Sequence, residues 1–322
     1  MKQILVLHTG GTIAMKENQL TGSVSPDTQN PLLNAPITLP EDADLIVEDI
    51  FNLPSPHITP DHMLKIKNRI QKAYEKGIDS VVITHGTDTL EETAYFLDIT
   101  IGHLLPIVLT GAMRSSNELG SDGLYNFASA IRVAACPDAK RQGVLVVMND
   151  EIHAARYVTK THTTNVATFR TPSIGPVGMV NKNEILFLQK TLNTQYADVD
   201  SISGFIPILK AYAGMNGELL EGLTHTSLDG LVIEALGAGN LPPENIKPLQ
   251  KMLAAHIPVV LVSRCFNGIA EPVYDYAGGG IQLQKMGVIF CPNINSQKAR
   301  LKLLVANHLP LEREQLVHFM QH

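Results

Sequence analysis

The sequence has few cysteines, and those it has do not form a recognisable pattern. Cys136, Cys265 and Cys291 are far apart, odd in number and never part of a C-x-x-C pair. This excludes a disulfide framework and a cysteine zinc site. All three lie within or at the ends of predicted core elements, so we expect them to pack in the core rather than to supply a nucleophile.

Long apolar runs are also absent. Hydrophobic residues make up 44% of the chain, yet no run approaches the roughly 18–20 residues of a membrane-spanning helix. The first apolar run, residues 4–7, stops at His8-Thr9-Gly10-Gly11 and is shorter than the roughly 7–15 residues of a secretory signal. We therefore expect no membrane association and a location in the reducing cytoplasm.

Charge is sparse and slightly negative. The 322 residues carry 25 Lys and Arg against 31 Asp and Glu, a net charge of −6, and only 17% of residues are charged. Without a basic excess, a nucleic-acid or anionic-membrane partner is not expected. A chain this apolar is also unsuited to disorder, so the composition indicates a globular protein with a large core.

Short apolar segments alternate with amphipathic ones along the first part of the chain. The strands predicted from the apolar segments cover residues 4–7, 80–84, 105–110 and 143–148, and the predicted helices begin at Pro60 and cover 91–102 and 124–135. Such strands are typical of a parallel sheet buried on both faces. The alternation predicts a doubly wound α/β domain with a mainly parallel sheet.

The length favours two domains, because domains usually have about 100–200 residues. A polar segment without period, residues 189–204, interrupts the alternation and is interpreted as a linker. Strands then recur at 230–235, 258–263 and 287–291, with helices at 244–256, 297–307 and 312–322. We therefore predict a larger N-terminal α/β domain, 1–188, and a smaller C-terminal α/β domain, 205–322.

The residues that follow the predicted strands are the candidates for chemistry, since ligands of open α/β sheets bind beyond the carboxyl ends of the strands. Residues 9–12 read TGGT and residues 85–89 read HGTDT. The first could be a phosphate-binding or simple tight turn, but G-x-G-x-x-G and G-K-[ST] are both missing, which argues against nucleotides. In the second, Asp88 or Thr89 could merely cap the next helix. His8 and His85 are interpreted as packed strand-end residues.

Together these residues could hydrolyse an amide, which requires a nucleophile, a base and donors for the oxyanion. Thr12, Thr87, Asp88 and Lys160 could supply the first two, and backbone N–H groups around Gly11 the donors. Lys160 lies in an apolar, hydroxyl-rich segment; desolvated it could accept a proton, and solvated it would be a surface charge. The serine-hydrolase motif G-x-S-x-G and the zinc motif H-E-x-x-H are absent.

Two long signatures resemble those of the bacterial-type L-asparaginases. They are TGGTIA at residues 9–14 and HGTDTLEETAYFLD at residues 85–98. LTGAMR, VVMND, YVTKTHTTNVATF, GAGNLP and QKARLKLL extend the likeness over nearly the whole chain. The resemblance implies a member of the cytosolic branch that converts L-asparagine and water to L-aspartate and ammonia, without metal or cofactor.

The resemblance also implies roles for single residues. Thr12 matches the nucleophilic threonine of the family. Thr87, Asp88 and Lys160 match the group that assists proton transfer or activates water, and Asp88 is also expected to bind the α-ammonium group of the substrate. Ser55 aligns with a serine that binds the α-carboxylate.

Three further implications concern substrate contacts and assembly. Gly11 and Ala112 fall in matching motifs and are expected to contact the substrate. Asn240 aligns with an asparagine that reaches the site of a neighbouring subunit. The family implies a homotetramer built as a dimer of dimers.

The sequence departs from the family pattern at the lid and beside Ser55. The lid expected at residues 16–30 has no tyrosine, because the first tyrosine of the chain is Tyr74. Activation would then rest on Thr87 and Lys160, or a partner's tyrosine such as Tyr274 would substitute. Pro56 stands where exported members have a polar side chain, so the hold on the substrate is expected to be weaker or differently arranged.

The residues allow alternatives for one substrate contact and for the function itself. Glu271 is a candidate for an acid presented across the dimer, or is simply a surface acid. The same scaffold would also suit a glutaminase or a broader amidase. A non-catalytic amino-acid-binding sensor is the third hypothesis.

Overall fold

The computed structural model describes residues 1–26, 32, 40, 42–191 and 195–322. The chain divides into two compact units, Met1–Asp198 and Val199–His322, each an α/β fold around its own sheet. The division falls inside the polar segment 189–204. The two-domain α/β prediction is confirmed, and each unit is described by itself.

The sheet of the first unit is mainly parallel, as predicted. Within the described residues it runs in the order β12-β11-β8-β7-β6-β5-β1-β4. The strands that lie parallel to one another are β1 (Lys2–His8), β4 (Ala43–Asp49), β5 (Ser80–Thr84), β6 (Ile107–Thr110) and β7 (Val144–Met148). An antiparallel edge follows, made of β8 (Glu151–Ala154), β11 (Gly178–Val180) and β12 (Ile185–Phe187).

The strand order reverses direction at β1. The chain passes from β1 to β4 on one side, and then to β5 on the other side of β1 before continuing outward. In doubly wound sheets such a switch point is where ligands bind, outside the carboxyl ends of the strands. The topology therefore predicts a ligand site at the turns that follow β1 and β5.

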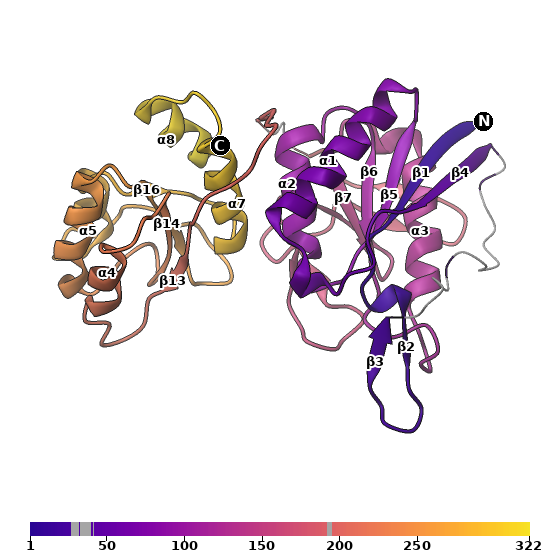
Figure 1. Ribbon diagram of the computed structural model, residues 1–322, viewed down its shortest axis with the longest axis horizontal. Helices are drawn as coiled ribbons and strands as arrows, with labels where there is room; N and C mark the ends of the chain where they lie inside the picture. The colour runs from indigo at the N-terminus through magenta and orange to yellow at the C-terminus, as the bar shows by residue number, and fades with distance from the viewer. Residues whose placement is uncertain (27–31, 33–39, 41, 192–194) are drawn as a thin grey trace. The chain divides into compact units, whose positions relative to one another are not determined.

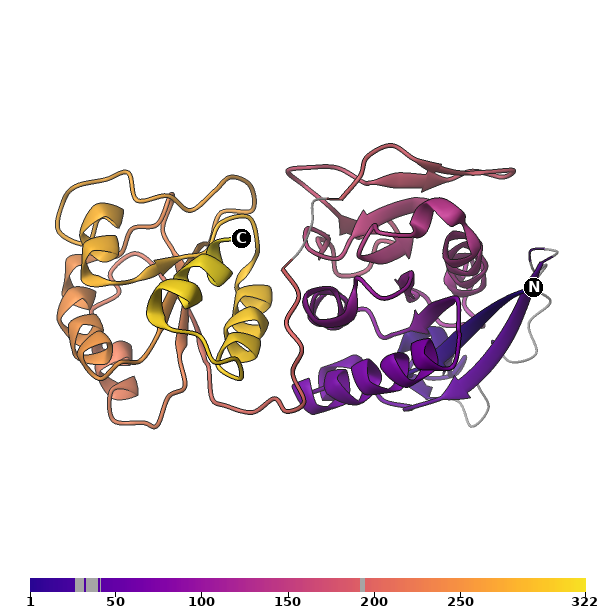
Figure 2. The same ribbon diagram turned by 90° about the horizontal axis from the view of Figure 1, so that it is seen from above.

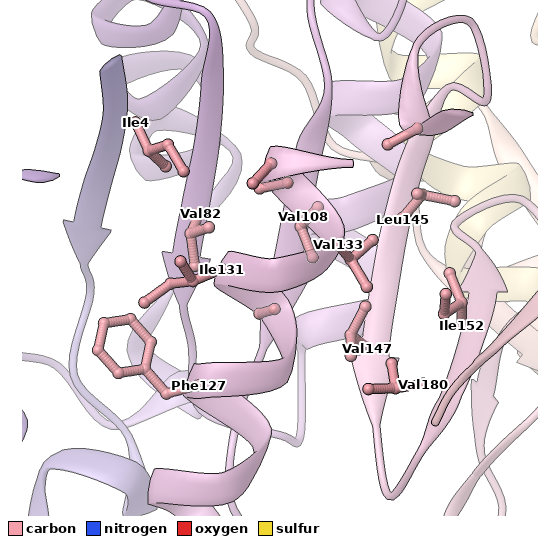
Figure 3. Packing of buried hydrophobic residues seen from close by; sticks show 14 of the residues in the cluster. Ile4, Val82, Val108, Phe127, Ile131, Val133, Leu145, Val147, Ile152 and Val180 are labelled. Carbon is pink, nitrogen blue, oxygen red and sulfur yellow. The ribbon is translucent and has the colours of Figure 1, made fainter. Parts of the chain in front are cut away.

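Helices cover both faces of this sheet. They are α1 (Pro60–Glu75), α2 (Leu90–Ile101) and α3 (Gly123–Ala135), and Figure 1 shows α1 and α2 on one side of the strands and α3 on the other. Because successive side chains of a strand point to opposite faces, only alternate strand residues meet α3. Figure 3 shows Phe127 and Ile131 of α3 packed with Val82 and Val108 of the sheet.

The edges of the sheet escaped prediction, and their composition explains why. β4 reads ADLIVED and is largely exposed, and β11 and β12 have three residues each. Edge strands are commonly short or charged, so they lack the apolar run that identifies a central strand. The sequence therefore identified the four central parallel strands and missed both borders.

The second unit contains a smaller parallel sheet in the order β13-β14-β15-β16. Its strands are β13 (Ile208–Lys210), β14 (Leu231–Ala235), β15 (Val259–Ser263) and β16 (Ile289–Phe290). Its helices are α4 (Glu218–Leu223), α5 (Ile246–Ala254), α6 (Gly280–Met286), α7 (Ser296–Ala306) and α8 (Arg313–Gln321). Figure 2 shows this unit from above, with its helices around the strands. In the described part of the chain, no helix has both the length and the apolarity needed to cross a membrane.

One expectation about the cysteines is wrong. Cys291 is buried and Cys136 is half-buried, but Cys265 is exposed in the loop that follows β15. The predicted strand was correct, but its apolar residues end at Val262, and the chain beyond Ser263 leaves the core. The prediction for Cys265 failed because Cys265 is close in sequence to the core strand β15 but lies beyond its end.

Candidate active site

Close contact between two glycine turns brings the ends of β1 and β5 together. Gly10 and Gly11, which follow β1, have φ of 101° and 83°, values that L-residues with side chains rarely adopt. A Cβ atom on Gly11 would lie 2.2 Å from Cα of Gly86, in the turn that follows β5. Only glycine at position 11 lets the two backbones approach this closely.

Thr12 begins a short 3-10 turn directly after these glycines. The turn spans Thr12–Ala14 and is closed by the N–H of Ala14, which donates to the carbonyl oxygen of Gly11 at 2.9 Å. Thr12 is half-buried, whereas Ile13 and Ala14 are buried. The turn thus anchors its apolar residues in the core and leaves the threonine accessible at the switch point.

The second turn assembles the other candidate groups around one ammonium. Nζ of Lys160 donates to Oγ1 of Thr87 at 3.0 Å and to Oδ1 of Asp88 at 2.6 Å. The side chain of Lys160 is only 17% exposed, that of Asp88 is 59% exposed, and Thr87 is buried. Lys160 therefore contacts both Thr87 and Asp88, which lie 73 and 72 positions before it in the chain. The predicted group of Thr87, Asp88 and Lys160 is thus in mutual contact.

Ser55 is held against the same turn. It begins the 3-10 turn Ser55–His57, is buried, and its Oγ accepts a hydrogen bond from the N–H of Asp88 at 3.1 Å. Thr89 occupies the N-cap position of α2, and its hydroxyl donates to the carbonyl oxygen of Ser55 at 2.8 Å. Of the two residues predicted to cap α2, Thr89 therefore occupies the N-cap position, whereas the carboxylate of Asp88 is hydrogen-bonded to Lys160. Pro56, next to Ser55, is exposed.

Ala112 lies on a third loop, which follows β6, the neighbour of β5. It is buried, and the preceding Gly111 lies against the β5 turn: a Cβ there would be 2.6 Å from the carbonyl oxygen of His85 and 3.1 Å from Cγ2 of Thr87. The loops after β1, β5 and β6 therefore converge. Within the first unit the structure gathers Gly11, Thr12, Ser55, Thr87, Asp88, Ala112 and Lys160 at these strand ends.

The two strand-end histidines are packed in the core, as predicted. His85 is fully buried; its Nδ1 lies 2.8 Å from the carbonyl oxygen of Gly86 and its Nε2 lies 2.9 Å from Oγ1 of Thr93. Since a carbonyl only accepts, Nδ1 carries the proton and Nε2 accepts from Thr93. Burial lowers the pKa of His85 to about 4, so a neutral ring supports the turn rather than exchanging protons.

The expected lid begins as a β-hairpin, β2 (Met15–Glu17) paired with β3 (Val24–Pro26). Figure 1 shows it protruding beyond the carboxyl ends of the sheet strands. Asn117 clamps its stem: Nδ2 donates to the carbonyl oxygen of Glu17 and Oδ1 accepts from the N–H of Glu17, both at 2.8 Å. Residues 27–30 of the expected lid lie outside the described residues.

Three candidates belong to the second unit, which is described by itself. Asn240 follows β14, and its Oδ1 accepts from the N–H of Gly280 at 3.2 Å. Glu271 and Tyr274 are exposed in the loop that precedes α6, where the ring of Tyr274 lies 5.9 Å from that of Tyr276. Their roles toward a substrate remain predictions.

The sequence analysis missed two residues that support the site. Glu91 is a buried acid that accepts from the N–H of Lys160, and Asn117 holds the hairpin. In the sequence Glu91 is one of two adjacent acids at the start of an otherwise largely apolar predicted helix, a signal that does not distinguish it from Glu92. Asn117 stands in a polar loop without any periodic pattern, so the sequence carries no comparable signal for it.

Two threonines, a lysine and a carboxylate at the switch point of an α/β sheet are typical of hydrolases that use a hydroxyl nucleophile. The family models agree with this class. Residues 3–193 match the asparaginase N-terminal model, and residues 206–320 match the glutaminase/asparaginase C-terminal domain. The chain belongs to the asparaginase family.

Individual relatives match over nearly the full length. The chain is 41% identical over 323 residues to a probable L-asparaginase of Deinococcus radiodurans, with 98% of this chain and 96% of the relative covered. It is 35% identical over 305 residues to an L-asparaginase of Bacillus licheniformis, with 94% and 95% covered. Its structure is similar to that of a probable cytoplasmic L-asparaginase from Campylobacter jejuni, with a TM-score of 0.86, 32% identity and 99% of each chain covered.

Proposed function

We propose that the protein is an L-asparaginase, which hydrolyses L-asparagine to L-aspartate and ammonia. The observation that carries the proposal is the contact of Lys160 with both Thr87 and Asp88, on the turn whose Gly86 lies against the Gly11-Thr12 turn. Membership of the asparaginase family and full-length similarity to L-asparaginases support the same substrate.

The reaction follows from the chemistry of these groups. Oγ1 of Thr12 attacks the side-chain amide carbon, and its proton passes through the Thr87–Lys160 pair to the departing nitrogen, which leaves as ammonia. Backbone N–H groups at the Gly11 turn stabilise the oxyanion of the tetrahedral intermediate. Water, activated by the same Thr87–Lys160 pair, then hydrolyses the acyl-enzyme and restores Thr12.

The rest of the proposed site fixes the amino acid. The exposed carboxylate of Asp88 binds the α-ammonium group, and Ser55, already hydrogen-bonded to the N–H of Asp88, binds the α-carboxylate. Gly11 and Ala112 contact the substrate from the turns after β1 and β6. No metal or cofactor takes part in this scheme.

The assembly and location are part of the proposal. We expect a homotetramer, a dimer of dimers in which Asn240 of one subunit completes the site of another. We also expect a cytoplasmic protein, in agreement with the description of the Campylobacter jejuni relative.

Ammonia release from L-asparagine tests this function. Thr12→Ala and Thr87→Val should each abolish turnover, because one removes the nucleophile and the other the hydroxyl that Lys160 contacts. Lys160→Met should lower kcat by about 10²-fold, the usual effect of removing an acid–base partner. Each variant is compared with wild type by circular dichroism to establish that it is folded, and full activity in either threonine variant would contradict the mechanism.

The second candidate function is that of a glutaminase, favoured by the C-terminal model, which covers glutaminases and asparaginases alike. One methylene distinguishes the two amides, and a pocket discriminates against it by only about 1–3 kcal/mol. Comparing kcat/KM for L-asparagine and L-glutamine decides between them. Binding of either amino acid in calorimetry without turnover would instead support a sensor.

A further inference from the structure

A buried acid lies behind the candidate catalytic lysine. Glu91, in the first turn of α2, is only 5% exposed. Its Oε1 accepts from the hydroxyl of Thr159 at 3.1 Å and, less closely, from the N–H of Lys160 at 3.4 Å. A single carboxylate oxygen thus contacts both residues of the short strand β9 (Thr159–Lys160).

Burial of a carboxylate is costly unless hydrogen bonds and favourable fields offset its desolvation. Glu91 has both, because it stands near the N-terminus of α2, where the helix dipole favours negative charge. Leu90 and the residues from Thr93 onward in α2 are buried, so this part of the helix is not a solvated face. The position of Glu91 therefore suits a bonded acid and not a surface charge.

The strand that carries Lys160 is too short to be rigid by itself. β9 has two residues, and it pairs with the equally short β10 (Phe169–Arg170). An isolated two-stranded ribbon is at best marginally stable. The bonds to Glu91 tie this ribbon to α2, a helix packed on the main sheet.

We propose that Glu91 is a positioning residue that sets the distance between Lys160 and Thr87. Thr87 and Glu91 belong to the same short stretch of chain at the start of α2, and Lys160 is hydrogen-bonded to both of them. Glu91 holds the backbone of Lys160, and Nζ of Lys160 returns to Thr87 at 3.0 Å. Both partners of the proton-transferring contact are thereby fixed to one helix terminus.

The inference rests on the proposed function, and its test uses steady-state kinetics with L-asparagine. Glu91→Ala should lower kcat by roughly 10- to 100-fold, since a misplacement of about 1 Å at a reacting group costs that much. KM should change less than kcat, because the bond from the N–H of Asp88 to Ser55 does not involve Glu91 and the Asp88 carboxylate stays on the same turn. Glu91→Gln keeps an oxygen acceptor and should retain kcat within about threefold.

Glu92→Ala is the matched control, since Glu92 is the next residue of the same turn and is half-buried. Its kcat should equal that of wild type within about twofold. An unchanged kcat in Glu91→Ala, or an equal loss in Glu91→Gln and Glu91→Ala, would overturn the proposal. In the second case the charge of Glu91, and not its bonds to β9, would be what matters.

A milder substitution guards against failure to fold. Thr159→Val removes the hydroxyl donor to Glu91 and should lower kcat by about three- to tenfold, while Thr159→Ser should restore it. In the Glu91→Ala background Thr159→Val should have no further effect, because residues that act as a unit are not additive. Independent, additive losses would overturn the proposal.

Amide hydrogen exchange separates this inference from the proposed function. The N–H of Lys160 should exchange faster in Glu91→Ala than in wild type, whichever amide the protein hydrolyses. If wild type released no ammonia and this difference persisted, the assigned substrate would be wrong and the positioning role would stand. If wild type were active and exchange at Lys160 were unchanged, the positioning role would fail alone.

Discussion

Gly11 and Gly86 determine how close the two threonine-bearing turns can come. The Cβ that alanine would add at position 11 would meet the backbone of Gly86 at 2.2 Å, and at position 86 it would meet Cβ of Ser55 at 2.7 Å. The first clash is with main-chain atoms, which cannot rotate away as a flexible side chain can. The glycines therefore allow two turns and the Ser55 segment to share one small volume.

Two buried histidines predict an acid-sensitive stability. Burial lowers the pKa of His85 and of His8 to about 4, with the charge of Asp49 opposing the shift at His8. In the unfolded chain both would titrate near pH 6.5. Stability is therefore fully present above pH 6.5 and falls between pH 6.5 and 4, by roughly 2 kcal/mol for each histidine at pH 5.

Urea midpoints at pH 7.5 and pH 5.0 measure this loss. His85→Asn keeps a side-chain N–H for the carbonyl oxygen of Gly86 but does not titrate, so its midpoint should fall less between the two pH values than that of wild type. An equal fall in both proteins would show that His85 remains neutral in the unfolded chain or charged in the folded one.

At the scale of elements, strand β2 of the β2–β3 hairpin is hydrogen-bonded on both of its sides. β2 pairs with β3 on one side, and on the other it bonds to Asn117 and Ser116, whose N–H donates to the carbonyl oxygen of Met15 at 3.2 Å. Strand β2, which follows Thr12 in the chain, therefore lies between β3 and the Ser116-Asn117 segment. The stem of the hairpin is fixed even though its tip, at Leu20, is 96% exposed.

Loss of the Asn117 clamp should loosen this stem. Asn117→Ala removes two hydrogen bonds worth about 1 kcal/mol each, so exchange of the N–H of Glu17 should rise by roughly 5- to 30-fold. Asn117→Asp keeps the acceptor but not the donor and should give a smaller increase. Leu119→Ala, in the same loop and 96% exposed, is the control and should leave exchange at Glu17 unchanged.

The central strands of the first sheet could be predicted because burial on both faces requires a continuous run of apolar residues in the sequence. Residues 80–84 and 144–148 are continuous β-branched or aliphatic runs with few exceptions, and each is followed by polar residues at the sheet end. The turns after β1 and β5 were therefore found as candidates. The contact of Lys160 with Thr87 was not derivable from spacing, since it depends on how β9 folds back across 73 positions. The support from Glu91 depends on the same fold-back.

At the scale of the whole molecule, specific contacts hold the chain to the first unit just before the second unit begins. The N–H of Ala197 donates to the carbonyl oxygen of Ile99 at 2.8 Å, and Oδ1 of Asp198 lies 2.7 Å from Nζ of Lys67. The Lys67 side chain is fully buried, whereas that of Asp198 is 77% exposed. The last residues of the first unit are thus tied to α1 and α2.

Removing the two partners of this ion pair should have unequal effects. Asp198→Ala takes a counter-charge from a buried ammonium and should lower the free energy of unfolding by about 1–2 kcal/mol, reduced from the value for a fully buried pair by the exposure of Asp198. Lys67→Met removes the buried charge and keeps the shape of the side chain, so it should cost less. Urea unfolding of both variants, with the exposed Asp200→Ala as control, measures the difference; a larger cost for Lys67→Met would contradict this account.

The hairpin that continues from Thr12 has a consequence for how such a protein can change over generations. The hairpin and the cluster around Lys160 are encoded in separate stretches: residues 15–26 form the hairpin, whereas Thr87, Asp88, Glu91 and Lys160 are joined around the start of α2. The bonds from Asn117 to Glu17 stand between the hairpin tip and Thr12. Insertions, deletions or new side chains at the tip can therefore accumulate while the hydrogen bonds that join Thr87, Asp88, Glu91 and Lys160 around the start of α2 are inherited unchanged.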